Sequence, residues 1–235
     1  METDDKKLIS RRNLLQLGTA FIGGGVVSSI GTKLVTAQIT NHPTITNSQE
    51  ALQALLDGNN RFAQKKRHSG DQSYSRLQEV AQGQKPFASI LGCADSRVPS
   101  EIVFDQGLGD LFVCRIAGNI ATPEAIGTLE YGSLELGSKL IMVLGHERCG
   151  AVTASVKKAE VPGQIGNLIE AIQPAVKKAK DQPGDKIENV CKTNILLQIK
   201  KLKSSPVLAE LVNTNKLMIV GGYYDLDNGK VSLVS

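Results

Sequence analysis

The chain contains no tryptophan, and aromatic residues make up only 4% of its 235 residues. Proteins that bind single-stranded nucleic acid use aromatic side chains as platforms on which the bases stack, so this scarcity argues against that function. An excess of one charge is missing too, because 27 basic residues are balanced by 23 acidic ones. A net charge of +4 does not provide the basic surface of a nucleic-acid-binding protein, and we expect no nucleic acid as a partner.

A long apolar run is also absent. The stretch from Leu14 to Ile30 comes nearest, but its length of about 17 residues lies at the lower limit for crossing a bilayer. The glycines Gly23-Gly24-Gly25 make this stretch poorly hydrophobic. It contains no cysteine, which excludes attachment of a lipid there. We therefore expect no stable membrane insertion of the mature chain.

The beginning of the chain instead predicts export. Ser10-Arg11-Arg12-Asn13-Leu14-Leu15 resembles a twin-arginine signal, and Val35-Thr36-Ala37 supplies small residues of the kind that a signal peptidase recognises. We expect residues 1–37 to be a signal peptide that is cleaved before Gln38, with the mature chain in the periplasm or a thylakoid lumen. An uncleaved membrane anchor is the alternative. N-terminal sequencing of the exported protein would test the cleavage position.

The remainder, residues 38–235, is predicted to be a single α/β domain. Apolar segments at 86–91, 111–115, 139–144 and 217–221 have the length of buried strands, and a tight turn at 227–229 leads to a last strand at 230–234. Helical patterns cover 123–136, about 164–181, 186–203 and 206–213. This alternation predicts a mainly parallel sheet of four strands, with a C-terminal edge strand, flanked by helices.

An additional amphipathic helix is predicted over residues 48–66. Asn47 and Glu50 form a start similar to a capping box, and Leu52, Leu55 and Phe62 follow at helical spacing. Because helices already flank the predicted sheet, the apolar face of this segment has little of its own domain left to cover. We therefore expect an arm that crosses onto a partner subunit, in a homodimer or a tetramer.

Two short motifs contain the most informative side chains. Cys93-Ala94-Asp95-Ser96-Arg97 follows the first predicted strand, and His146-Glu147-Arg148-Cys149-Gly150 follows the third. Both motifs therefore belong at carboxyl ends of strands, where open α/β sheets place their sites. Two thiolates and one imidazole form a soft ligand set that suits Zn²⁺, and three protein ligands leave the fourth tetrahedral position open for chemistry.

The spacing of the second motif suggests how two of its residues meet. We interpret His146 and Cys149, three positions apart, as neighbours on one side of the first turn of a helix. A helix N-terminus also favours thiolate over thiol. The alternative is that Cys93 and Cys149 are buried structural cysteines and His146 is a loop histidine.

The two motifs and their flanks, Gly92 to Pro99 and Gly145 to Gly150, resemble the β-class carbonic anhydrases of the bacterial and cyanobacterial type. The likeness runs from about Leu52 to Val234 and includes the segments 105–110, 115–119, 130–131 and 222–227. It implies one zinc ion per chain with Cys93, His146 and Cys149 as ligands. It also implies reversible hydration of carbon dioxide to bicarbonate and a proton through a zinc-bound hydroxide.

The resemblance assigns further roles. Asp95 and Arg97 are expected to form a catalytic ion pair, with Asp95 becoming a fourth metal ligand only in a closed state. The expected substrate-binding residues are Gln84, Phe112, Tyr131 and, through its backbone N–H, Gly150. Ile90 stands where some bacterial members have a tryptophan that helps to build a regulatory bicarbonate site, which puts that form of regulation in doubt. The roles of Cys114, Cys191 and His68 stay open.

Two other functions fit the same ligand set. One is hydrolysis of another small linear molecule, such as carbon disulfide. The other is a zinc-binding homologue without catalytic activity. The presence of both Asp95 and Arg97, together with Gln84, favours an enzyme over the second of these.

Overall fold

The computed structural model describes residues 45–235, so the predicted signal peptide and its cleavage site lie outside the described residues. The central sheet of this part has the strand order β2-β1-β3-β4-β5. The strands are β1 (Ala88–Gly92), β2 (Leu111–Arg115), β3 (Leu140–His146), β4 (Met218–Tyr224) and β5 (Val231–Val234). The first four are parallel and β5 is antiparallel to β4, which confirms the predicted sheet.

The helices follow the predicted pattern with two additions. They are α1 (Ser48–Ala63), α2 (Tyr74–Val80), α3 (Ser100–Val103), α4 (Pro123–Leu134), α5 (Gly150–Lys157), α6 (Ile165–Lys178), α7 (Lys186–Lys203) and α8 (Pro206–Asn213). The additions are α2 and α3. Helix α2 buries none of its residues and α3 is a single turn, so neither leaves an apolar pattern in the sequence. None of the helices in residues 45–235 is long and apolar enough to cross a membrane.

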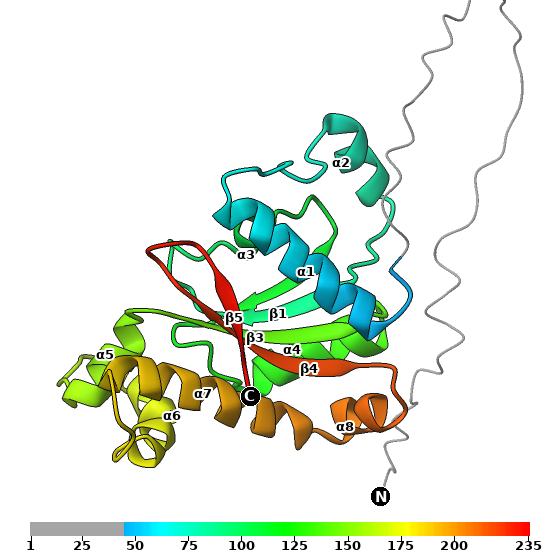
Figure 1. The fold of residues 1–235 in the computed structure, drawn as a ribbon. Helices are drawn as coiled ribbons and strands as arrows, with labels where there is room; N and C mark the ends of the chain where they lie inside the picture. Colours follow the sequence, from blue (N-terminus) through cyan, green and yellow to red (C-terminus); the bar gives the residue numbers. More distant parts are fainter. Residues whose placement is uncertain (1–44) are drawn as a thin grey trace, which may run out of the picture. The chain divides into compact units, whose positions relative to one another are not determined.

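Helices cover the two faces of the sheet unequally (Figure 1). Helices α4 to α8 lie on one face, where Leu91 and Val143 pack with Leu129 and Ile195. Helices α1 and α3 lie on the other face, where Ile90 and its neighbours pack with Leu55 and Phe104. Successive residues of a strand point to opposite faces, and both faces are covered, so every residue of β1 and β3 is buried.

The position of α1 corrects one prediction. Ala51 and Leu55 are buried on this chain's own sheet. The buried amide of Asn59 donates to the carbonyl oxygens of Val103 (3.1 Å) and Gly229 (2.9 Å) and accepts from the N–H of Val231 (2.8 Å). The expectation that the apolar face of α1 has little of its own domain left to cover is therefore wrong. The later helices pack on one face and leave the other to α1 and α3.

A buried carboxylate ties α1 and the following loop to the end of α3. Asp105 accepts hydrogen bonds from Nε of Arg61 (2.7 Å) and from the backbone N–H groups of His68 (3.0 Å) and Ser69 (2.8 Å). Its side chain is fully buried, whereas that of Arg61 is 31% exposed. Burial alone would raise the pKa of Asp105, but the hydrogen bonds from His68 and Arg61 hold this pKa below its ordinary value.

We predict that Asp105→Asn destabilises the fold, because an amide would place two donor hydrogens against existing donors. The free energy of unfolding should fall by about 2–4 kcal/mol, as for a broken buried ion pair with one partly exposed partner. Since the pKa of Asp105 is depressed in the folded state, its contribution is present above the ordinary value of about 3.9 and is lost as the pH falls further.

Chemical denaturation at matched protein concentration measures this difference at pH 7 and pH 3. The exposed neighbour Glu101, changed to Gln, is the control and should alter stability by no more than about 0.5 kcal/mol. Equal stability of Asp105→Asn and the wild type at pH 7 would contradict the proposed anchoring role.

Candidate metal centre

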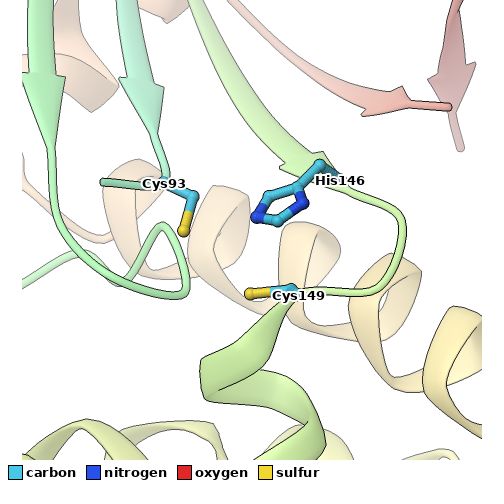
Figure 2. Close-up of side chains that lie close together, drawn as sticks. All are labelled: Cys93, His146 and Cys149. Atoms are coloured by element: carbon cyan, nitrogen blue, oxygen red, sulfur yellow. The ribbon is translucent and has the colours of Figure 1, made fainter. Parts of the chain in front are cut away.

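The carboxyl ends of β1 and β3 place the predicted ligands together. Cys93 follows β1 directly, His146 is the last residue of β3, and Cys149 precedes the first residue of α5. Figure 2 shows the three side chains pointing toward a common centre. Their ligand atoms all lie within 4.8 Å of one another, and all three residues are buried. One chain therefore supplies the Cys93–His146–Cys149 cluster, which we call the metal centre.

The geometry of the second motif differs from the prediction. His146 belongs to a strand, so His146 and Cys149 do not share the first turn of a helix. Arg148 has a φ of +51°, which is uncommon for a residue with a side chain, and this residue turns the chain between them. Cys149 then caps α5 in an extended conformation. A strand–turn–helix connection, which residue spacing cannot distinguish from a helical turn, brings the two ligands together.

The ring of His146 is oriented for a metal ion. Its Nδ1 lies 2.8 Å from the carbonyl oxygen of Glu147, which can only accept, so Nδ1 holds the proton and donates. In the neutral ring, the lone pair therefore belongs to Nε2, which is buried and has no hydrogen-bond partner among the described residues. A buried lone pair beside two sulfur atoms fits a soft divalent cation, and the carbonyl fixes the tautomer as metal-binding histidines require.

The two thiols are electrostatically linked. The hydrogen bond between Cys149 and Cys93 holds the pKa of Cys93 well below its ordinary value, with a further contribution from the Gly118 N–H, which lies 3.2 Å from Sγ. The same bond and burial raise the pKa of Cys149. The second thiol therefore gives up its proton readily only when another cation takes the place of that proton, and metal binding and proton release are coupled here.

Asp95 and Arg97 form the predicted ion pair beside the cluster. Nε and Nη2 of Arg97 donate to the two carboxylate oxygens of Asp95 at 2.9 and 2.8 Å, and the backbone N–H of Arg97 donates to Oδ1 at 2.9 Å. The Arg97 side chain holds the pKa of Asp95 well below its usual range. Oδ2 of Asp95 lies 3.8 Å from Nε2 of His146, so an ionised carboxylate adjoins the metal centre.

Sequence reasoning gave no role to Arg115, which the structure places at the site. This last residue of β2 donates from Nε to the carbonyl oxygen of Cys93 (2.9 Å) and from Nη2 to that of Asp95 (2.5 Å). It thereby fixes the backbone on both sides of Ala94. Only the sheet register, in which Arg115 is paired with Gly92, would have indicated that Arg115 lies beside Cys93. This register could not be read from the sequence.

The predicted substrate-binding residues separate into two groups. Gly150 is the first residue of α5 and adjoins the cluster. Phe112 and Tyr131 form a ring pair with centroids 6.1 Å apart, but Phe112 is level with Ser89, roughly 13 Å before Cys93 along the strand. Gln84 precedes β1 and lies toward the opposite end of the sheet. The structure does not bring Gln84, Phe112 or Tyr131 to the metal centre of their own chain.

Comparisons with known proteins identify the family of the chain. A sequence model of the family described as carbonic anhydrase matches residues 88–231, more than half of the chain. Carbonic anhydrase 2 of Mycobacterium tuberculosis is 37% identical over 193 residues, which cover 80% of this chain and 93% of that protein. The carbonic anhydrase of Mycolicibacterium smegmatis is 38% identical over 198 residues, with coverage of 80% and 94%.

Solved structures specify the class. A β-carbonic anhydrase of Coccomyxa, in complex with acetazolamide, is 25% identical, has a TM-score of 0.61, and is matched over 81% of this chain and 87% of that chain. The chain belongs to the β-class carbonic anhydrases. A tetrameric β-carbonic anhydrase of Sordaria macrospora shares the fold, with a TM-score of 0.65, 24% identity, and coverage of 79% and 97%. In this β-class carbonic anhydrase, Cys93, His146 and Cys149 are the residues that could hold the family's zinc ion.

We predict that the purified protein binds one zinc ion per chain and that Cys149→Ser loses most of it, because a serine hydroxyl is a poor ligand for zinc. Cys114→Ser is the matched control, since Cys114 lies on β2 outside the cluster, and this variant should keep its zinc. Elemental analysis after gel filtration measures both. Retention of a full zinc ion by folded Cys149→Ser would show that the cluster is not the metal site.

Proposed function

We propose that the metal centre catalyses the reversible hydration of carbon dioxide to bicarbonate with one zinc ion per chain. The observation that supports this most strongly is the ionised Asp95 carboxylate, held by Arg97 at 3.8 Å from His146 Nε2. A purely structural zinc site would be closed by a fourth protein ligand, and the Asp95 side chain is held by the guanidinium instead. When bound, zinc would supply a Lewis acid that lowers the pKa of water.

The surrounding residues have distinct tasks in this proposal. Asp95 accepts a hydrogen bond from an O–H group of the attacking water and so orients a lone pair of the water oxygen toward carbon dioxide. Arg97 keeps the carboxylate in place for this task. The N–H of Gly150 is one of the first helical N–H groups of α5, which have no acceptor within the helix, and it can donate to an oxygen of the substrate.

A hydration assay on zinc-loaded protein tests the reaction directly, with carbon disulfide as a parallel substrate. Hydration of carbon dioxide supports the proposal. Turnover of carbon disulfide alone would favour the alternative hydrolase. A fully zinc-loaded protein that turns over neither substrate would indicate a zinc-binding homologue without catalysis.

We further propose that a second copy of the chain completes each site. Gln84, Phe112 and Tyr131 lie far from the metal centre of their own chain, and residue Tyr131 is about half exposed at 51%. Strand β2 is a partly exposed edge strand, and such edges are normally covered. Large apolar side chains are exposed on the segments that flank it, namely Tyr74, Leu77, Leu108 and Leu134. These features favour a homodimer or a tetramer that places one chain's aromatic pair against the other's metal ligands.

We predict that two impaired variants restore each other when they are co-expressed. Cys149→Ser removes the metal, and Gln84→Leu removes an amide donor. If the metal and Gln84 of one site come from different chains, a mixed dimer contains one intact site and recovers up to about half of the wild-type activity per dimer. If both come from the same chain, no intact site can form. Activity of the mixed dimer that stays at the level of the single variants would contradict the shared site.

We predict opposite anion access for two variants of the ion pair. Arg97→Ala frees a carboxylate close to the metal, so Asp95 should become a fourth ligand at about 2.0–2.2 Å, with zinc retained and hydration abolished. Asp95→Ala leaves the fourth position open, so azide or thiocyanate should still bind while activity falls. Titration of both zinc-loaded variants with these anions measures the difference. Equal anion binding by the two variants would show that Arg97 does not keep Asp95 off the metal.

A further inference from the structure

A loop that follows β2 contacts one of the metal-binding sulfur atoms. The N–H of Gly118 donates to Sγ of Cys93 at 3.2 Å. Gly118 has a φ of +76°, a conformation that favours glycine, and a Cβ atom there would lie 2.6 Å from Cδ1 of Ile172. The orientation of the donor therefore depends on how the loop around residues 116–121 is held.

Two buried amides of α7 hold this loop. Nδ2 of Asn194 donates to the carbonyl oxygen of Gly118 at 2.9 Å, and Oε1 of Gln198 accepts from the N–H of Ala121 at 2.9 Å. Nε2 of Gln198 also donates to Oδ1 of Asn194 at 2.9 Å, so each amide fixes the orientation of the other. Asn194 and Gln198 are one helical turn apart and are only 1% and 6% exposed. The two amides therefore bind the loop at Gly118, before Asn119, and at Ala121, after it.

Burying two amides has a cost unless each polar atom is paired, and the three bonds above satisfy this requirement. Apolar side chains would fill the interface between α7 and the loop without that cost. We infer that Asn194 and Gln198 are positioning residues that fix the Gly118 N–H against the sulfur of Cys93. The inference rests on the proposed metal site but not on the identity of the reaction.

The electronic effect of this bond follows from the ligand set. Two thiolates donate more negative charge to a metal than neutral imidazoles do, which opposes the acidification of water. An N–H group that donates to a thiolate withdraws part of that charge and makes the bound metal a stronger Lewis acid. Asn194 and Gln198 therefore act on the metal through Gly118 and Cys93 without touching either substrate or metal.

The test uses cobalt(II) in place of zinc, because the sulfur-to-cobalt charge-transfer band reports the electron density on the thiolates. Asn194→Leu removes the donor to Gly118, and Gln198→Met removes the contact to Ala121 and the support of Asn194. Both variants should shift the band to lower energy, with the larger shift in Asn194→Leu. In zinc-loaded protein, kcat at pH 7 should fall on the order of 10-fold in Asn194→Leu and should recover as the pH is raised.

Leu202→Ala is the control for loss of stability, because Leu202 is fully buried on the same helix one turn beyond Gln198. It should lower the melting temperature and leave the band and the pH profile unchanged. If Asn194→Leu does not fold, Gln198→Met still provides the comparison. An unshifted band in the folded variants, or an equal shift in Leu202→Ala, would overturn the inference. A wild-type protein with the band but without hydration activity would overturn only the proposed reaction.

Discussion

Gly92 of β1 is paired with Leu144 of β3, and the metal centre depends on this register. The pairing places Cys93 directly after β1 and His146 at the last position of β3, so both lie at the carboxyl ends of adjacent parallel strands. A slip by one residue would turn the side chains of a whole strand to the opposite face, where the core residues no longer match. Because every residue of β1 and β3 is buried, such a slip is strongly disfavoured, and the core itself determines where two of the three ligands stand.

The loops around the ligands are held mainly by arginine side chains and amides. Arg115 fixes the carbonyl groups of Cys93 and Asp95, and Arg97 fixes the carboxylate of Asp95. On the other side, Arg148 binds both carboxylate oxygens of Asp227, which joins the turn between His146 and Cys149 to the β4–β5 connection. The planar guanidinium group suits this task because it can bind two acceptors in a fixed geometry. Local charge and the hydrogen-bonding capacity of the backbone thus replace regular secondary structure at the site.

The sequence predicted the features that depend on local pattern. The structure confirmed the apolar strands, the helical periodicity and the position of Cys93 directly after a strand, whereas His146 is itself the last residue of β3. What it could not predict depends on how strands are ordered and faces are covered. The role of Arg115 requires β2 to lie beside β1, and the packing of α1 requires the later helices to gather on the opposite face. The position of Phe112, level with Ser89 and distant from Cys93, likewise follows from strand register.

The contacts of Asn59 have a consequence for the order of folding. This residue of the first helix binds backbone groups of Gly229 and Val231, which are 170 and 172 positions further along the chain. During synthesis, α1 leaves the ribosome long before these partners exist, so its buried amide stays without them until the last strand has been made. Contacts of such long range close a large loop and are slow to form. The contacts between α1 and the β4–β5 connection therefore form in a late step of folding. The loss of a few residues at the C-terminus would also destabilise the packing of α1.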